Sequence, residues 1–247
     1  MKKTAKDGTR YFTSPVLEKA GCGHFFGTRD FGNNHQSSHR TIKGVFPEVR
    51  AIARAKQVHG RTALMVEDDR GAKSLRRRHA DIVITGTPGI AAAVRTADCT
   101  PVLICDPKAR VVAAVHAGWK GTGLKAPKMA VETMAEEFGC VPSRMFAAIG
   151  PVIGTCHYQV DGPVIEALKE GFGKEAERFL ADDEEPGKAR LDLSAANKYA
   201  LMEAGLRSAN ISELSMCTYC HADLFYSYRR ECKGVPSLYH AVWIRPD

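Results

Sequence analysis

Short apolar runs separated by glycine and proline dominate the middle third of the chain. Four such runs cover residues 81–85, 90–94, 101–105 and 110–115. Runs of this length that are apolar throughout and bounded by turn formers are typical of buried strands. We therefore predict four consecutive buried strands in this region. Further strands are predicted at 24–26, 62–67, 146–149, 211–216, 224–228 and 238–244.

Four other segments have helical character. The first, 124–138, combines apolar side chains with a polar side of three glutamates, and Gly139 is placed to end it. The last, 194–204, has Ser194 as its expected N-cap and Gly205 as its stop. Turn formers predict irregular structure over most of residues 22–48. The remaining two predicted helices cover 161–170 and 174–181.

The size and charge of the chain limit its class. Its 247 residues contain no internal repeat and no linker, so we predict one mixed α/β domain over residues 1–247. Lys and Arg total 35 against 28 Asp and Glu, and the net charge of +7 fits an anionic ligand, nucleic acid or solubility alone. The densest basic stretch, 70–79, lacks interleaved aromatic residues and is interpreted as a solvated loop. RNA binding by Arg76–Arg78 is the non-enzymatic alternative, and we expect no nucleic-acid partner.

The sequence pattern predicts neither a membrane-spanning helix nor a secretory signal peptide. No apolar run approaches the roughly 18 residues of a membrane span. Charged Lys6, Asp7 and Arg10 stand where the apolar part of a secretory signal would lie. We therefore expect a cytoplasmic protein without a membrane partner. The eight cysteines are spread over a chain long enough to bury its own core, which predicts a mostly reduced set.

Three potential metal ligands stand at the edges of predicted core strands: His59, Cys99 and His116. Two imidazoles and a thiolate suit zinc or copper, and strand ends can fix such ligands while a loop admits substrate. Separations of 40 and 17 residues are not a local metal motif, so spacing alone favours an ordinary buried cysteine and ordinary histidines. Cys99 with His116 also suits a metal-free nucleophile–base pair. Asp98 could orient His116, although strand alternation counts against it.

Other segments suggest weaker sites. Cys217-Thr218-Tyr219-Cys220-His221 matches the pattern for c-type haem attachment. We rank buried structural cysteines or site-lining residues first, a redox pair second and haem last. Half of a zinc site with nearby Cys232 is a further alternative, although no second pair at finger spacing completes it. Glycine-containing turns at 86–89, 118–123 and 150–154 could approach an anion. Arg229 and Arg230 could clamp a phosphate, although a surface salt bridge is the commoner role of such a pair.

At these residues the chain resembles the YfiH, or laccase-domain, family. The matching segments run in family order from residue 56 to the C-terminus: 56–60 (KQVHG), 96–103 (TADCTPVL), 116–121 (HAGWKG), 149–154 (IGPVIG), 191–193 (LDL) and 225–230 (FYSYRR). Residues 23–29 resemble the family's N-terminal segment more loosely. The stretch from Asp30 to Gln57 departs from the family pattern and looks shortened.

The resemblance implies a single α/β domain with β-sheet layers between helices, similar to the catalytic domain of cytotoxic necrotizing factors. It implies that His59, Cys99 and His116 form the metal-binding catalytic set. The implied activity is phosphorolysis of adenosine, inosine, guanosine or methylthioadenosine, together with adenosine deamination. We expect Zn²⁺ as the cofactor, with copper as the alternative metal, and purine nucleosides and phosphate as partners.

Two enzymatic alternatives stay open at this stage. The first is a copper-dependent polyphenol oxidase, although nine histidines without a His-x-His pair disfavour a multicopper cluster. The second is a metal-free Cys–His hydrolase. Residues expected to contact substrate are Arg29, Gln57, Lys120 and Arg229. The candidates for a general acid are His24, His157 and Asp98.

Overall fold

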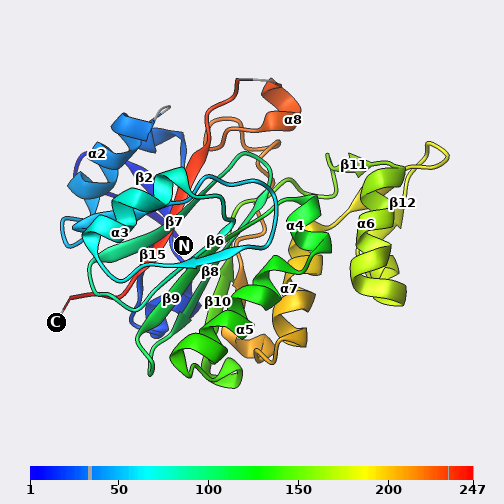
Figure 1. The fold of residues 1–247 in the computed structure, drawn as a ribbon. Coiled ribbons are helices and arrows are strands. Elements are labelled where there is room, and N and C mark those ends of the chain that lie inside the picture. Colours follow the sequence, from blue (N-terminus) through cyan, green and yellow to red (C-terminus); the bar gives the residue numbers. More distant parts are fainter. Residues whose placement is uncertain (33–34, 233, 247) are drawn as a thin grey trace.

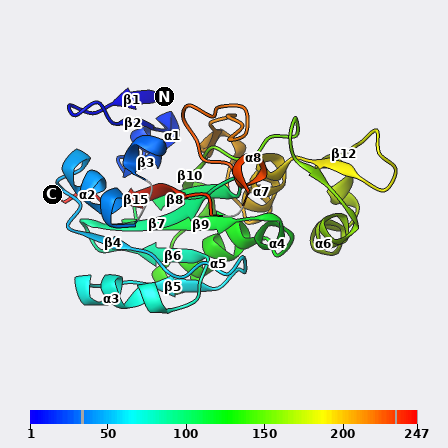
Figure 2. The same ribbon diagram turned by 90° about the horizontal axis from the view of Figure 1, so that it is seen from above.

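Two six-stranded sheets form the centre of the molecule (Figures 1 and 2). The computed structural model describes residues 1–32, 35–232 and 234–246. The first sheet has the order β1 (Lys2–Thr4), β2 (Arg10–Phe12), β3 (Gly23–Gly27), β15 (Leu238–Trp243), β7 (Ile90–Thr96) and β4 (Ala51–Ala53). The second has the order β14 (Ile211–Glu213), β10 (Phe146–Ile149), β8 (Thr100–Asp106), β9 (Val111–Ala117), β6 (Ile82–Thr85) and β5 (Ala63–Met65).

The central strands are apolar throughout because both of their faces are buried. In β7, Ile90, Ala92 and Val94 face the core between the two sheets, whereas Ala91 and Ala93 face the opposite layer. Strand β8 alternates in the same way, with Leu103 and Cys105 inside and Val102 and Ile104 outside. Since successive strand residues point to opposite faces, a strand covered on both sides needs apolar residues at every position. The four buried strands predicted in the middle third are therefore confirmed as β6 to β9.

Helices cover the outer faces of both sheets. Helix α2 (His35–Val45) packs Ile42 against the outer face of the first sheet. Helices α5 (Ala126–Phe138) and α7 (Leu193–Glu203) cover the outer face of the second sheet. Figure 1 shows α2 and α5 on opposite sides of the sheets. The order helix, sheet, sheet, helix confirms the predicted α/β fold with β-sheet layers between helices.

A small third sheet projects from one side of the molecule, where Figures 1 and 2 both show it with α6. Its strands are β11 (Gln159–Val160), β13 (Ala189–Leu191) and β12 (Leu180–Asp182), and it packs on α6 (Gly162–Phe172) around a separate apolar cluster. The shorter helices are α1 (Pro15–Lys19), α3 (Asp69–Ser74), α4 (Trp119–Gly123) and α8 (Tyr228–Glu231), with 3-10 turns at Arg29–Phe31, Leu75–Arg77, Pro142–Arg144, Gly173–Arg178 and Ser208–Asn210. No helix among the described residues is long and apolar enough to cross a membrane.

Two segments predicted as irregular are helical. Residues 22–48 contain α2, and Asn33 and Asn34 of this segment lie outside the described residues. The basic stretch 70–79 is not a loop over most of its length, because residues 70–77 belong to α3 and the 3-10 turn after it. Asp68 caps α3 by accepting the backbone N–H of Gly71 at 2.6 Å, and Leu75 is buried. The cap and one buried face outweigh the charged composition that predicted a loop.

Three smaller expectations were also wrong. Segment 174–181 forms a 3-10 turn and the start of β12 instead of an α-helix, and 224–228 forms turns leading into α8 instead of a strand. The N-cap of α7 is Asp192, whose carboxylate accepts the backbone N–H of Ala195 at 2.9 Å. The side chain of Ser194 donates to Glu213 instead. Gly139, however, does end α5, with a φ of 64°.

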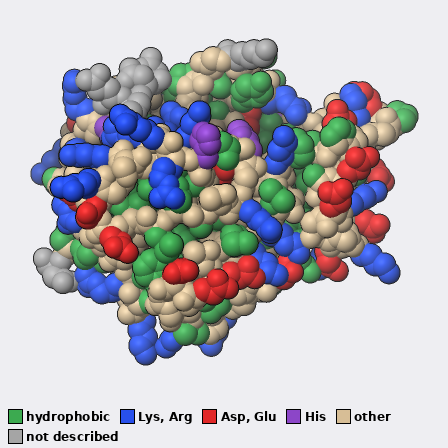
Figure 3. All heavy atoms as spheres, in the orientation of Figure 1, with side chains coloured by type: hydrophobic (Ala, Val, Ile, Leu, Met, Phe, Trp, Pro, Cys, Tyr) green, Lys and Arg blue, Asp and Glu red, His purple; other side chains and the backbone are tan. Residues whose placement is uncertain are grey.

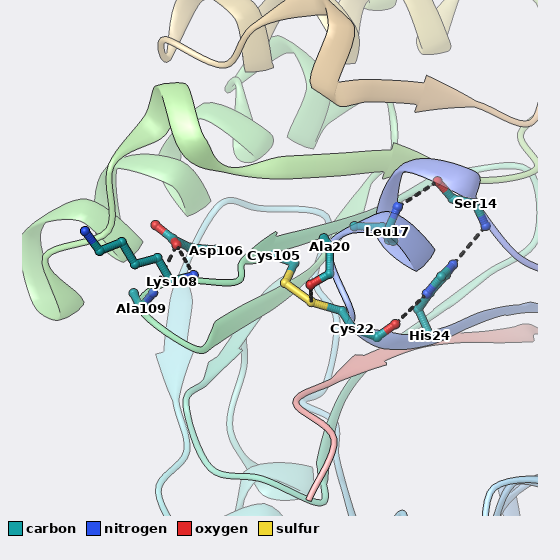
Figure 4. Close-up of a disulfide and its surroundings, with 9 residues drawn as sticks. All are labelled: Ser14, Leu17, Ala20, Cys22, His24, Cys105, Asp106, Lys108 and Ala109. Carbon is teal, nitrogen blue, oxygen red and sulfur yellow. Dashed lines mark hydrogen bonds between the residues drawn. A yellow bond between two sulfur atoms is a disulfide. The ribbon is translucent and has the colours of Figure 1, made fainter. Parts of the chain in front are cut away.

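A disulfide joins Cys22, just before β3, to Cys105 in β8 (Figure 4). Both side chains lie in the core between the two sheets, so the bond links one sheet to the other. This pair is the exception within the mostly reduced set that the sequence predicted, and it forms where the two small side chains meet in the buried layer. The remaining six cysteines are free: Cys99, Cys140, Cys156, Cys217, Cys220 and Cys232.

Candidate metal centre

The three predicted ligands come together beside the end of β9, an inner strand of the second sheet. His59 lies in the loop between β4 and β5, Cys99 in the turn between β7 and β8, and His116 near the end of β9. One ligand atom from each lies within 4.8 Å of the others. The rings of His59 and His116 meet edge to face, with centroids 4.8 Å apart. The structure therefore brings together residues that are separated by 40 and 17 positions in the chain.

Strand pairing explains this convergence. Strands β8 and β9 are antiparallel neighbours in which Pro101 pairs with His116, so the turn that carries Cys99 lies beside the end of β9. On the other side of β9, Ile82 pairs with Val115, which places Asp81 opposite His116. The backbone N–H of His116 donates to the carbonyl of Asp81 at 2.8 Å. Both neighbours of β9 thus deliver a polar residue to the same point.

Asp81 holds two of the three ligands in place. Its carboxylate, which is 1% exposed, lies 2.7 Å from Nδ1 of His116. It also accepts the backbone N–H groups of Val58, His59 and Gly60, at 3.2, 3.0 and 2.7 Å. These bonds fix the turn in which His59 has a φ of 63°. A carboxylate behind a histidine fixes the ring and leaves its other nitrogen for a metal. Sequence reasoning missed Asp81, because only the register of β6 against β9 identifies it.

Asp98 faces away from this centre. It is buried, has a φ of 84°, and its carboxylate accepts hydrogen bonds from the Thr218 hydroxyl at 2.5 Å, the Ser227 hydroxyl at 3.0 Å and the Arg229 backbone N–H at 2.7 Å. Asp98 therefore anchors the segment around residues 218–229 to the turn that carries Cys99. It does not orient His116, and its occupied oxygens make it a poor general acid.

The electrostatics of the centre favour a charged thiolate. Burial opposes ionisation of Cys99, but the neighbouring His116 and hydrogen bonds from both histidines outweigh it and lower the Cys99 pKa to about 6. Burial also opposes protonation of His116, yet Cys99 and Asp81 raise the His116 pKa to about 9. Near neutral pH the metal-free pair is therefore a thiolate beside an imidazolium. The thiolate is the form of cysteine that binds metals and acts as a nucleophile.

The residues present fit a metal ion. One thiolate and two imidazoles supply three ligands, which leaves a fourth position open in a tetrahedral zinc site. Gly118 allows the close approach, because a Cβ at this position would lie 2.9 Å from Sγ of Cys99 and 3.1 Å from Cδ2 of His59. Figure 3 shows histidine side chains on the surface of one face, among lysine and arginine side chains.

Two predicted substrate contacts, Gln57 and Arg29, are engaged elsewhere. The amide of Gln57 makes both of its hydrogen bonds with the backbone of Arg95, at 2.7 and 2.9 Å, and so ties the His59 loop to β7. Arg29 donates to the carbonyl of Phe225 at 3.0 Å and pairs with Glu231. Both side chains hold backbone segments together, which is a positioning role.

The other two predicted contacts are more accessible. Lys120 follows directly after the segment 116–119 and lines a shallow depression between α4 and α6. The guanidinium of Arg229 is exposed and reaches the carbonyl of Gln159 at 3.0 Å. The guanidinium of Arg230 donates hydrogen bonds to backbone carbonyls and to Glu231. The two arginines therefore do not form a phosphate clamp.

His24 and His157, the remaining general-acid candidates, have structural surroundings. Figure 4 shows His24 between Ser14 and Cys22. One ring nitrogen of His24 accepts the backbone N–H of Ser14 at 2.8 Å and the other lies 3.0 Å from the carbonyl of Cys22. Burial lowers the His24 pKa. His157 belongs to a separate cluster of cysteines. The structure therefore places neither His24 nor His157 in the cluster of His59, Cys99 and His116.

Two stacked sheets with a His–Cys–His cluster at their strand ends define an α/β protein with a candidate metal centre. The chain belongs to the family described as multi-copper polyphenol oxidoreductase laccase, which it matches over residues 29–245. This match, together with relatives named YfiH and YlmD, confirms the resemblance found in the sequence.

Relatives with similar sequences are named as purine-nucleoside enzymes. A purine nucleoside phosphorylase of Bacteroides thetaiotaomicron is 36% identical over 180 residues, which are 70% of this chain and 66% of that protein. An adenosine deaminase of an unknown prokaryotic organism is 38% identical over 150 residues, 61% of this chain and 56% of that protein. Both alignments span less than two thirds of the relative's length. A purine nucleoside phosphorylase of Synechocystis is 35% identical over 91% of this chain and 90% of its own.

The fold is also found in a solved structure. The crystal structure of YlmD from Geobacillus stearothermophilus superposes with a TM-score of 0.87 at 26% sequence identity and covers 99% of both chains. The likeness therefore includes the projecting third sheet as well as the two large ones. It confirms the YfiH-like fold expected from the sequence.

Proposed function

We propose that this protein is a zinc-dependent purine nucleoside phosphorylase that acts on adenosine, inosine, guanosine or methylthioadenosine, and that it also deaminates adenosine. The convergence of His59, Cys99 and His116 on one point, with Asp81 behind them, carries the proposal. The names of the relatives support the two reactions, because phosphorylases and a deaminase appear among them.

The three ligands would hold the metal through one sulfur and two nitrogens. A zinc ion held there would supply Lewis acidity, which can lower the pKa of a water molecule to about 7. Asp81 accepts the Nδ1–H of His116, which would leave the lone pair of Nε2 free to hold the metal. Its bonds to the backbone of residues 58–60 hold His59 at the same point. The half-buried Cys99 would contribute negative charge, which a divalent ion would neutralise.

Phosphorolysis makes a further demand on the protein. The glycosidic C–N bond breaks as a phosphate oxygen bonds to the ribose carbon, and the purine leaves with the bonding electrons and gains a proton. Positive charge must therefore hold the phosphate near the ribose. We assign this role to Lys120. It is exposed and stands two residues after Gly118, which lies so close to Cys99 that a Cβ there would be 2.9 Å from Sγ. Arg229 is the second candidate, since its guanidinium is exposed.

The test uses purified, zinc-loaded protein with inosine and phosphate. We expect hypoxanthine and ribose 1-phosphate to form in equal amounts, and adenosine to yield inosine when phosphate is left out. Cys99→Ser should abolish both reactions, whereas Cys232→Ser, a free exposed cysteine, should not. Zinc-loaded protein that releases no purine base from any of the four nucleosides would refute the proposed phosphorylase activity.

A copper-dependent polyphenol oxidase is the second candidate, favoured by the family description. Among residues 1–32, 35–232 and 234–246, the clusters of potential metal ligands contain at most two histidines each. A multicopper centre needs more histidines than either cluster supplies. Oxygen consumption with a phenol, measured on copper-loaded and zinc-loaded protein, separates the two functions. A metal-free Cys–His hydrolase is separated from both by its insensitivity to chelators.

A further inference from the structure

A second cluster of metal-ligating side chains lies outside the centre described above. Cys156 and His157 come from the turn before β11, and Cys217 and Cys220 come from a turn in the segment after β14. One ligand atom from each of the four lies within 4.8 Å of all the others. The two pairs are about 60 residues apart in the chain, so their meeting is a result of the fold.

The spacing of three of the four atoms matches a tetrahedron around zinc, and the fourth, Sγ of Cys217, lies within 4.8 Å of each of them. Zinc lies about 2.3 Å from sulfur and about 2.0–2.1 Å from nitrogen, so tetrahedral geometry puts two sulfurs about 3.8 Å apart and a sulfur and a nitrogen about 3.5 Å apart. Here Sγ of Cys156 and Sγ of Cys220 are 3.6 Å apart. Nδ1 of His157 lies 3.2 Å from Sγ of Cys156 and 3.4 Å from Sγ of Cys220.

The backbone around the cluster is also arranged for a bound thiolate. The backbone N–H of Gly154 donates to Sγ of Cys217 at 3.2 Å, a contact that stabilises negative charge on sulfur. A Cβ on Gly154 would lie 3.3 Å from Sγ of Cys156 and 3.3 Å from Cβ of Cys217. Cys217 and Cys220 have the C-x-x-C spacing that many structural zinc sites use.

Contacts between and around the two ligand-bearing turns hold them in place. The ring of His157 stacks on Tyr219, with centroids 3.9 Å apart and an angle of 16° between planes. Arg230 donates to the carbonyls of Thr218 and Tyr219 at 2.9 and 2.6 Å. Parallel bridging between Val152 and Cys217 joins the two segments just before the cluster. The four ligands are therefore positioned before any ion arrives.

We propose that Cys156, His157, Cys217 and Cys220 bind one Zn²⁺ ion as a structural site, separate from the centre of His59, Cys99 and His116. Four protein ligands complete the tetrahedron and leave no position for substrate. The sequence interpretation of Cys217-x-x-Cys220 as half of a zinc site lacked its other half, and Cys156 with His157 supplies it. Cys232 is not a member of the cluster.

The position of this site indicates what it stabilises. The segment of Cys156 leads into β11 and the projecting third sheet, and Cys217 lies in the segment that contacts Asp98. The backbone N–H of Ile153 also donates to the carbonyl of Asp98 at 3.1 Å. A zinc ion at this junction would fasten the projecting sheet to the body of the protein, directly behind the turn that carries Cys99.

The decisive measurement is the zinc content of the full-length protein, purified reduced from zinc-supplemented cells without a histidine tag. We expect two zinc ions per chain in the wild type, and one in Cys99→Ser and in the double variant Cys217→Ser with Cys220→Ser. Cys232→Ser is the matched control and should keep two. The proposal is overturned if the double variant holds as much zinc as the wild type, or if the only zinc of the wild type is lost in Cys99→Ser.

Two further measurements guard against a variant that fails to fold. Cys156→Ser changes one exposed side chain, and we expect its zinc affinity at this site to fall at least tenfold in competition with a chelator. In the wild type, removal of the second zinc ion should expose three additional reactive thiols, because coordination protects them. Equal rates of thiol reaction before and after chelation would show that the cluster does not bind zinc. A disulfide within the cluster that persists in the reduced preparation would show that it is a redox pair instead.

Discussion

Replacing Asp81 by asparagine removes one charge and almost no volume from the candidate metal centre. The carboxylate accepts hydrogen bonds from the backbone N–H groups of Val58, His59 and Gly60 and lies against Nδ1 of His116. An amide can accept at only one of its two ends. In Asp81→Asn the NH₂ group must therefore face at least one of these N–H donors.

The structure sets the size of two separate effects. A buried donor left without an acceptor costs about 1–3 kcal/mol, so the free energy of unfolding should fall by that amount. Loss of the carboxylate behind a metal-binding histidine typically weakens metal binding by about 10–100-fold. At about 1.4 kcal/mol for each factor of ten, this equals about 1.4–2.7 kcal/mol of zinc-binding free energy.

Asp106 provides the matched control. It is also a buried aspartate at a strand end, and its carboxylate accepts the backbone N–H groups of Lys108, Ala109 and Val141 at 2.9, 3.0 and 3.1 Å. Asp106→Asn should lose similar stability, because it creates the same conflict between donors. It should keep the zinc affinity of the wild type, since Asp106 contacts no candidate metal ligand among the described residues.

The assay combines urea unfolding, zinc affinity from competition with a chelator, and kcat/KM for inosine phosphorolysis. We expect Asp81→Asn to lose stability, zinc affinity and kcat/KM, and Asp106→Asn to lose stability alone. Equal zinc affinity and equal kcat/KM in the two variants would refute the role assigned to Asp81.

Three further outcomes are expected. Cys99→Ser should lower zinc content and turnover together, and alkylation of wild-type Cys99 should accelerate once metal is removed; full activity of metal-free protein would identify Cys99 as a nucleophile instead. Gly118→Ala should weaken zinc binding at least tenfold in chelator competition, because its Cβ would crowd Cys99. Gly44→Ala is the control, since there is open space at its Cβ, and it should match the wild type. Equal zinc affinities in the two variants would contradict the crowding. Burial lowers the His240 pKa to about 3, and the charge of His116 is a smaller cause. Below about pH 6.5, His240 therefore binds a proton in the unfolded chain but not in the folded chain. Stability in urea should therefore fall as pH drops below 6.5, by up to about 1.4 kcal/mol per pH unit, and an unchanged slope in His240→Phe would rule out this source.

The sequence predicted the strands best where burial is complete. Strand β10 has the predicted bounds of 146–149, and β6 to β9 lie where the apolar runs are. Helix α2 could not be predicted in this way, because Ile42 is its one fully buried large apolar side chain and turn formers surround it. Strands of three residues, such as β4, carry too few positions for a pattern.

The candidate site was predictable in part. The set of His59, Cys99 and His116 followed from the resemblance of their surrounding segments to a known family, since their spacing alone favoured ordinary residues. Asp81 required the register of two strands, which hydrophobic pattern does not contain. The meeting of Cys156 and His157 with Cys217 and Cys220 required the full path of the chain around β10 and β14.

The strand order of the first sheet has a consequence for how the protein is made. Strand β15 lies between β3 and β7, although more than 140 residues separate it from β7 in the chain. While a ribosome still holds residues 238–243, the middle of this sheet is vacant and the strands on either side have no common partner. The end of β7, which leads into the turn that carries Cys99, gains its pairing with Leu238 only when β15 is inserted. Assembly of the candidate metal centre is thus a late event of biosynthesis, and a nascent chain that lacks β15 presents two unpaired edges to chaperones.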